Sequence, residues 1–456
     1  MRDIVWIGCG AGFAGDRTDA ALPVVAALSR QEGPRFLIYE TLAERTLALQ
    51  QLERRRNPTL GYAPALDRFL APVLAQCLTH GIRIVGNFGG ANPRAAADCI
   101  LALAAERGHP AIRVGVVEGD DLTGVLGPRD FAAREVAGKL LAAAPDVIAA
   151  NAYLGAGPIA EALGQGADVV VTGRVADSAL ALGPLMHAFG WRLDDWDRLA
   201  AGTLVGHLLE CGAQVTGGYF ADPGVKDVPG LAGVGYPIAE VAPDGSFVVT
   251  KPAGTGGRVD RLTVTEQTLY EVHDPAAYLA PDVVLDLTNV AIEEVGPGRV
   301  RVSGARGRPR PDTLKATVCI DGGVLGEAEI SYAGPNAAAR ARLAAGIVRE
   351  RVGRRRPGLQ VRIDAIGIVS VLGDSGGAVL ADARADTDDV RLRFAAQSDD
   401  VAAVEFLLDE VEALYCAGPA GGAGVRRCLT PRLASASCLI ERALVAPKVT
   451  LVGGRA

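Results

Sequence analysis

Residues 3–19 read DIVWIGCGAGFAGDRTD, an apolar run that passes directly into a glycine-rich loop. Similar short β-branched runs recur to about residue 190 and alternate with alanine- and leucine-rich stretches of helical apolar spacing. The expected strands are Asp3–Gly8, Phe36–Thr41, Ile82–Asn87, Arg113–Glu118, Asp146–Asn151 and Asp168–Thr172. The expected helices are Ala20–Gln31, Leu42–Arg56, Pro64–His80, Pro93–Arg107, Pro128–Ala143 and Pro158–Gly164. Strands that are apolar on both faces and alternate with helices predict a doubly wound, mostly parallel sheet.

The second half of the chain has a different residue pattern, because polar and apolar residues alternate along its expected strands. The expected strands here are Arg258–Val264, Val283–Val290, Arg299–Ser303, Leu314–Cys319, Gly326–Ser331 and Val390–Ala396, and the expected helices are Asn336–Val352 and Val401–Tyr415. This pattern favours a smaller α+β domain with a mixed or antiparallel sheet. We therefore predict a Rossmann-like or flavodoxin-like α/β domain at 1–190, a glycine-rich hinge and pocket segment at 191–257, and an α+β domain at 258–456.

Composition narrows the classes of function. The chain has 456 residues, of which 49% are hydrophobic and 22% charged, a profile that excludes a disordered or fibrous protein. A net charge of −7 predicts no electrostatic binding of nucleic acid or of anionic membranes. The N-terminus lacks the features of a signal peptide, and no apolar run reaches the roughly 18 residues of a membrane helix. We expect a cytoplasmic homo-oligomer with a small-molecule ligand. The eight cysteines of the chain lack CxxC spacing, so we expect them to stay reduced.

Polar residues and glycines follow the expected strands of the first half, where ligands of doubly wound sheets bind. They include Asn87, Gly89, Gly90, Asn92, Asn151, Arg174, Asp177 and Ser178. The first loop adds Asp16, Arg17 and Asp19, which we expect to form a polar cluster with Arg174 and Asp177. In such a cluster an arginine can clamp a carboxylate or phosphate while an acid acts as base. A buried ion pair that ties the loops together is the alternative, and the two are compatible.

The first loop also matches a dinucleotide-binding fingerprint. Gly10, Gly12 and Gly15 have the GxGxxG spacing, and Glu40 ends the next expected strand. Against this, Asp16 and Asp19 at the start of the helix would repel a pyrophosphate. NAD(P) binding therefore stays an alternative, and a glycine turn over a pocket is favoured for the glycines alone.

Two further segments carry candidate chemistry. His207, Glu210 and Cys211 share one helical face, which suits an acid–base pair or, less well, metal ligands, although a structural histidine is the alternative. Lys251 begins a glycine-rich stretch that contains Thr255 and could bind an anion such as the phosphates of coenzyme A. We predict no metal site.

Seven motifs together resemble one known family. In order they are IGCGAGFAGDR, GNFGGANP, TGRVADSALALGPL, AGTLVGHLLECGAQVTGGYF, GYPIAEVAPDG, KPAGTGGRV and ALYCAGPAGGAGVR. The set resembles the acyclic terpene utilisation family. The resemblance implies a role in the catabolism of terpenes such as citronellol and geraniol, whose intermediates are coenzyme A thioesters. Several family members carry a further small domain beyond the point corresponding to Ala456, which suggests either a separate small partner subunit here or a different role.

These observations predict a cytoplasmic lyase or hydratase acting on a carboxylate or an acyl-coenzyme A thioester. The expected catalytic residues are Asp16, Asp19, Arg174, Asp177, His207 and Glu210. The expected substrate-binding residues are Gly12, Arg17, Asn87, Gly89, Gly90, Asn92, Asn151, Ser178, Lys251 and Thr255. Two alternatives stay open: an NAD(P)-dependent oxidoreductase, and a non-catalytic acyl-coenzyme A-binding subunit of a larger complex.

Overall fold

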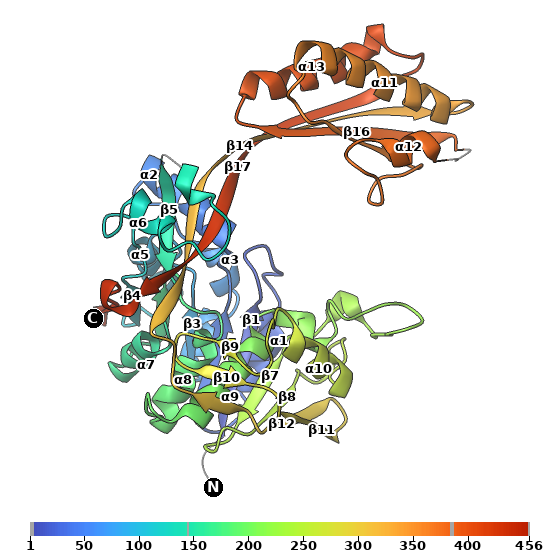
Figure 1. Cartoon of the computed structure of the whole chain (residues 1–456). Helices are drawn as coiled ribbons and strands as arrows, with labels where there is room; N and C mark the ends of the chain where they lie inside the picture. The colour runs from blue at the N-terminus through green and yellow to red at the C-terminus, as the bar shows by residue number, and fades with distance from the viewer. Residues whose placement is uncertain (1–3, 144–145, 384–386, 455–456) are drawn as a thin grey trace. The chain divides into compact units, whose positions relative to one another are not determined.

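The computed structural model describes residues 4–143, 146–383 and 387–454 (Figure 1). The chain divides into two compact units. Unit 1 consists of Met1–Cys319 and Ser435–Ala456, and unit 2 of Ile320–Ala434. Both predicted domain boundaries, after residues 190 and 257, lie inside unit 1. The segment expected to be a hinge, 191–257, instead contributes a buried helix and two strands of the main sheet.

Unit 1 is built on a ten-stranded sheet with the order β11-β12-β8-β7-β1-β2-β3-β6-β4-β18. Its five central strands are parallel, as predicted: β1 (Val5–Ala11), β2 (Arg35–Tyr39), β3 (Ile82–Gly86), β6 (Val169–Thr172) and β4 (Arg113–Glu118). Antiparallel strands extend both edges: β7 (Ile238–Val241), β8 (Phe247–Thr250), β12 (Arg299–Ser303) and β11 (Ala291–Gly296) beyond β1, and β18 (Lys448–Gly453) beyond β4. The central strands have buried side chains because helices cover the sheet.

The helices of unit 1 lie between its strands in the sequence. They are α1 (Ala21–Leu28), α2 (Glu44–Arg56), α3 (Leu66–Leu70), α4 (Leu74–Thr79), α5 (Pro93–Glu106), α6 (Pro128–Ala132), α7 (Gly157–Gly164), α8 (Ala179–Phe189), α9 (Trp196–Leu209) and α10 (Arg261–Leu269). The chain passes β1, β2, β3 and β4 in one direction and then turns back to β6. Because parallel crossovers are right-handed, this reversal places α7 on the face opposite α5. Helix α7 packs on α8, and α8 packs on α9. The doubly wound arrangement is therefore confirmed.

Several elements differ from the sequence prediction. Strand β5 (Val147–Ala152) pairs with β14 (Thr313–Ala333) instead of joining the ten-stranded sheet, and β14 replaces two separate expected strands. The strand expected at Arg258–Val264 is wrong, because Asp260 accepts hydrogen bonds from the backbone N–H groups of Leu262 and Thr263 and so begins helix α10. The expected long helix Pro128–Ala143 is reduced to α6 and a turn of 3₁₀ helix, η1 (Leu141–Ala143).

Unit 2 is the α+β part, and its sheet has the order β15-β16-β14-β17. Strand β16 (Asp389–Ser398) pairs antiparallel with β15 (Arg362–Ile366) and with β14, while β17 spans Ala423–Glu441. Helices α11 (Ala337–Arg355) and α13 (Val401–Ala417) lie side by side over this sheet, and α12 spans Ala378–Asp382 (Figure 1). Their apolar faces enclose a core that includes Tyr332, Val348 and Phe394. The predicted smaller α+β part with an antiparallel sheet is confirmed.

Smaller elements complete unit 1. A three-stranded sheet of β13 (Arg306–Arg308), β10 (Val284–Asp286) and β9 (Tyr278–Leu279) packs against α9 through β13 and β10. The 3₁₀ helices are η2 (Gly212–Thr216), η3 (Leu231–Gly233) and η4 (Arg442–Leu444), besides η1.

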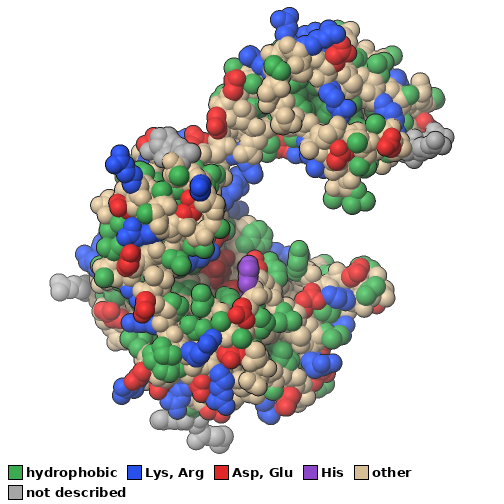
Figure 2. Space-filling model, in the orientation of Figure 1, with side chains coloured by type: hydrophobic (Ala, Val, Ile, Leu, Met, Phe, Trp, Pro, Cys, Tyr) green, Lys and Arg blue, Asp and Glu red, His purple; other side chains and the backbone are tan. Residues whose placement is uncertain are grey.

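The distribution of charge on the surface agrees with the nearly balanced numbers of acidic and basic residues in the sequence. Figure 2 shows basic and acidic side chains interspersed over the visible face of the chain. None of the helices in the described ranges has both the length and the apolar character needed to cross a membrane. All eight cysteines lie among the described residues and are free.

Candidate functional site

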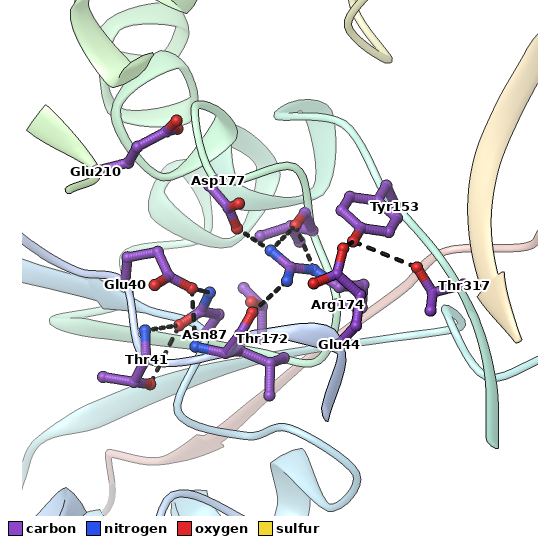
Figure 3. A network of polar contacts seen from close by, with 12 residues as sticks. Glu40, Thr41, Glu44, Asn87, Tyr153, Thr172, Arg174, Asp177, Glu210 and Thr317 are labelled. Carbon is purple, nitrogen blue, oxygen red and sulfur yellow. Dashed lines mark hydrogen bonds and ion pairs between the residues drawn. The ribbon is translucent and has the colours of Figure 1, made fainter. Parts of the chain in front are cut away.

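A buried polar network lies where the parallel strands of unit 1 end (Figure 3). Glu40 follows β2, Asn87 follows β3, Asp120 follows β4, and Arg174 follows β6. All four side chains are buried, although each carries charge or strong hydrogen-bonding groups. Burying such groups costs free energy unless they have partners, so their contacts define the site.

Arg174 is the centre of this network and is 1% exposed. Its Nε donates to the carbonyl oxygen of Val175 at 2.8 Å, and its Nη2 donates to the same oxygen at 2.6 Å. Nη2 also binds the Asp177 carboxylate, and Nη1 donates to the carbonyl oxygen of Leu42. The ring of Tyr153 covers the guanidinium, with its centroid 4.6 Å from Cζ. The predicted pairing of Arg174 with Asp177 is present as an ion pair within one loop, in which Asp177 is partly exposed, while Arg174 also binds the backbone of Leu42 in the loop after β2.

Glu40 and Asn87 form a second part of the network. Asn87 Nδ2 donates to Glu40 Oε1 at 2.9 Å, and the same oxygen accepts from the backbone N–H of Leu42 at 2.7 Å. Asn87 Oδ1 accepts from the backbone N–H of Thr41 at 2.7 Å. Burial raises the pKa of Glu40 above its ordinary value, and the charge of Glu210 raises it further, although Arg174, Asn87 and Leu42 act in the opposite direction. Glu40 therefore keeps its proton to a higher pH than an exposed glutamate does.

Asp120 and Asn151 form a third part, beside the backbone of Arg174. The Asp120 carboxylate accepts from the backbone N–H of Arg174 and from Asn151 Nδ2, both at 2.8 Å. Burial nevertheless raises the pKa of Asp120 to about 6. The other end of the Asn151 amide, Oδ1, is buried and has no hydrogen-bond partner among the described residues.

Glu44, the first residue of α2, lies on the other side of Arg174 from Glu40 (Figure 3). The Tyr153 hydroxyl donates to Glu44 Oε1 at 2.5 Å, and Lys315 Nζ lies 3.4 Å from the same oxygen. Burial alone would raise the pKa of Glu44, but the hydrogen bond from Tyr153 and the charges of Lys315 and Arg174 lower it overall. The pKa values of Glu40 and Glu44, four residues apart, thus shift in opposite directions. Lys315 was missed from the sequence because β14 brings it to the network from a distant part of the chain, whereas Tyr153 follows an expected strand at the same edge as Asn151.

His207 and Glu210 form the pair that their spacing predicts. His207 Nδ1 lies 3.2 Å from Glu210 Oε1 near the end of α9, and the histidine is 2% exposed. Burial lowers the pKa of His207, but the hydrogen bond and charge of Glu210, with backbone carbonyls of Gln267 and Thr268, raise it overall. Burial raises the pKa of the neighbouring Cys211 thiol to about 12, so this thiol stays protonated. No group of three or more metal-binding side chains occurs in the described ranges of the chain.

The loop after β1 makes other contacts than the sequence predicted. Asp16 accepts from the backbone N–H groups of Gly12 at 2.7 Å and Arg17 at 2.8 Å, and it also accepts from the Tyr236 hydroxyl. The Arg17 guanidinium donates to backbone carbonyls of η3 at 3.0 and 3.4 Å, and Asp19 is exposed. The hydrogen bonds of this loop therefore go to Tyr236 and η3, and not to Arg174 and Asp177 as expected.

This geometry does not fit a dinucleotide. The N–H of Gly12, which a pyrophosphate would need, already binds Asp16. A Cβ atom on Gly12 would lie 2.4 Å from the carbonyl carbon of Cys211, so the loop packs tightly against the chain just before η2. Strand β1 runs through Gly10 to Ala11, and α1 begins only at Ala21, beyond the reach of the glycine loop. Glu40, the expected ribose ligand, is bound to Asn87.

The remaining predicted residues have local roles. Asn92 caps α5 by accepting from the Ala95 N–H at 3.4 Å, and its Nδ2 donates to two backbone carbonyls at 2.8 Å. Lys251 Nζ donates to the carbonyl oxygen of Thr255 at 2.7 Å, so this cation binds its own loop. Gly89 and Gly90 form the turn after β3, where a Cβ atom would meet Thr172 and Gln50 respectively, and Ser178 is buried just before α8.

The comparisons with known proteins agree with the resemblance seen in the sequence. The family model described as "Acyclic terpene utilisation family protein AtuA" matches residues 5–451. The chain belongs to this family. No curated protein and no solved structure gives a significant match.

Three of the sequence motifs that resemble this family contain residues of the polar network. TGRVADSALALGPL contributes Arg174 and Asp177, and AGTLVGHLLECGAQVTGGYF contributes His207 and Glu210. A third motif, GNFGGANP, contributes Asn87. Family membership ties the chain to acyclic terpene utilisation.

Proposed function

We propose that this chain is a lyase or hydratase that acts on a carboxylate or an acyl-coenzyme A thioester in acyclic terpene breakdown. The observation that carries the proposal is the pair of Glu40 and Glu210. Glu40 is buried, and burial together with the charge of Glu210 raises its pKa above the ordinary value, although Arg174 and Asn87 act in the opposite direction. A buried carboxyl group with a raised pKa suits a general acid, and a second carboxyl group nearby can serve as the general base.

The proposed roles follow from the contacts. Glu210, bound on one side by His207 Nδ1, acts as the base that removes a proton from the carbon next to the substrate carbonyl. Glu40, held by Asn87, donates a proton to the hydroxyl that leaves the neighbouring carbon, so the group departs as water. The reverse sequence adds water to the double bond. His207, Asn87 and Arg174 are positioning residues in this scheme, because they bind other protein groups.

Glutamine substitutions test the proposal. We expect Glu40→Gln and Glu210→Gln each to lower kcat by about 100-fold or more, since one acid or base contributes about that much. The assay incubates the purified chain with a panel of unsaturated and hydroxylated acyl-coenzyme A thioesters and the matching free acids, and measures a mass change of one water. The matched control is Glu405→Gln on the exposed side of α13.

Two results would contradict the proposal. Full activity in both glutamine variants would remove these residues from the chemistry. Binding of thioesters by the wild type without any turnover would favour the non-catalytic acyl-coenzyme A-binding subunit. His207→Gln serves as the test of positioning, because it should move the pH profile of kcat. The cytoplasmic location, the homo-oligomer and the small partner subunit expected from the sequence stay predictions.

A further inference from the structure

Helix α2 packs beside β5 and contacts the segments that follow three strands of unit 1 (Figure 1). Gln51 Nε2 donates to Asp121 Oδ2 after β4 at 3.3 Å, and Arg54 Nη1 donates to the carbonyl oxygen of Ala91 after β3 at 2.6 Å. The first residue of α2 accepts from the Tyr153 hydroxyl after β5. The helix therefore covers the edge of the sheet where doubly wound proteins bind their ligands. The network residues at this edge are buried, so a ligand reaches them only when a covering element moves.

The buried face of α2 has few apolar side chains. Of its four buried residues, Leu47 and Ala48 are apolar, whereas Gln50 and Gln51 are amides. The six buried residues of α5, a helix of similar length, are all apolar. Burial of apolar surface supplies most of the free energy that holds a helix on its domain, so α2 is held less firmly than α5.

The Gln50 side chain opposes the covering position of α2. It is 2% exposed, and neither its Nε2 nor its Oε1 has a hydrogen-bond partner among the described residues. The amide lies against the turn after β3, because a Cβ atom on Gly90 would be 1.7 Å from Gln50 Oε1. A buried polar group without a partner costs free energy, which is recovered when water reaches it. Movement of α2 away from this turn therefore satisfies the amide.

Contacts of Glu44 hold the start of α2 in place. The Tyr153 hydroxyl donates to Glu44 Oε1 at 2.5 Å, and Lys315 Nζ lies 3.4 Å from the same oxygen. The ring of Tyr153 also covers the guanidinium of Arg174, so this contact joins α2 directly to the network. Behind it, Cys319 Sγ of β14 lies 3.9 Å from the carbonyl oxygen of Glu44 and is 3% exposed. The first turn of α2 thus packs against this thiol.

We propose that α2 is a lid over the polar network, and that it is closed in this structure. Glu44 and Tyr153 form the latch that keeps the lid closed, and the buried amide of Gln50 favours its opening. Both are positioning residues, because they act on the helix and not on a ligand. The inference concerns access to the network and does not depend on which reaction takes place there.

The native thiol of Cys319 reports the opening of the lid. The whole chain is treated with excess N-ethylmaleimide, and mass spectrometry of its peptides gives the rate at which each cysteine is modified. Cys77 of α4 is completely buried and reports unfolding of the core of unit 1. We expect Cys319 to react at least about tenfold faster than Cys77, because a lid opens more often than a whole core unfolds.

Two substitutions should change this rate in opposite directions. Tyr153→Phe removes the hydroxyl that donates to Glu44 but keeps the ring, so we expect Cys319 to react about tenfold faster than in the wild type. Gln50→Met replaces the amide by an apolar side chain of similar length, so we expect the thiol to react about tenfold more slowly. The matched control is Glu53→Gln on the exposed face of α2, which should leave the rate unchanged.

Two results would overturn the inference. Equal rates for Cys319 and Cys77 in the wild type would mean that the thiol becomes accessible only when the core unfolds. A Cys319 rate that is unchanged in Tyr153→Phe, or that rises by the same factor as the Cys77 rate, would mean that no latch holds α2. None of these measurements uses turnover, so the proposed function is tested separately.

Discussion

Asp120 shows how burial changes the protonation of a single carboxyl group. Its pKa rises from 3.8 to about 6 in the folded chain, so the folded state binds this proton more tightly than the unfolded state. The free energy of unfolding should therefore fall as pH rises from about 4 to about 6 and level off above. At 1.36 kcal/mol per pKa unit, the contribution of Asp120 is on the order of 3 kcal/mol.

The variant Asp120→Asn isolates this effect. Urea unfolding at a series of pH values should show that the difference in unfolding free energy between wild type and variant decreases by roughly 3 kcal/mol over this range. The control is Asp121→Asn, at the next residue, whose carboxylate binds Thr123 and Gln51. A difference that does not change with pH would show that Asp120 is already ionised in the folded chain at low pH.

At the scale of one element, helix α9 carries His207, has Glu210 as its C-cap residue, and packs directly on the chain before α8. A Cβ atom on Gly206 would lie 2.3 Å from the carbonyl oxygen of Ser178. A Cβ atom on Gly202, one turn earlier, would meet the flexible end of Leu182 at 2.6 Å. Alanine favours helix over glycine by about 1 kcal/mol, but a backbone atom cannot move aside as a leucine methyl group can.

We therefore expect the two alanine variants of α9 to differ. Gly206→Ala should lower the free energy of unfolding by about 1–3 kcal/mol and reduce activity, because α9 must move away from Ser178 and shift Glu210. Gly202→Ala, the matched control, should cost less. The measurement is urea unfolding of both variants beside a kcat assay. Equal stabilities would mean that α9 adapts to the added methyl group at no cost.

Individual elements also show how much of the structure can be predicted from the sequence alone. Strand β4 begins and ends where its apolar run predicts, and the His207–Glu210 pair follows from helical spacing. The wrong predictions have physical causes that cannot be seen in a short stretch of sequence. Helix α10 depends on one capping carboxylate, Asp260, in a stretch that alternates like a strand. The network gains Lys315 because β14 pairs with β5 far along the chain, and Asp16 turns from Arg174 because Gly12 and Tyr236 satisfy it.

At the scale of the whole molecule, each unit has its own core, while β14 and β17 run through both units. Every residue of the polar network belongs to unit 1. Phe394 is completely buried in the core of unit 2, and Leu28 of α1 is completely buried in unit 1. Cutting either side chain back to alanine should cost about 2–5 kcal/mol through the lost contacts and the cavity left behind.

Separate cores predict separate unfolding transitions in calorimetry, since chains with several compact units commonly depart from two-state behaviour. Phe394→Ala should lower the Tm of one transition and leave kcat at lower temperatures unchanged, because it removes nothing from the network. Leu28→Ala should lower the Tm of the other transition and abolish activity when that transition occurs. If both variants shift one common transition, β14 and β17 couple the units into a single cooperative system, and the stability of the site then depends on the core of unit 2.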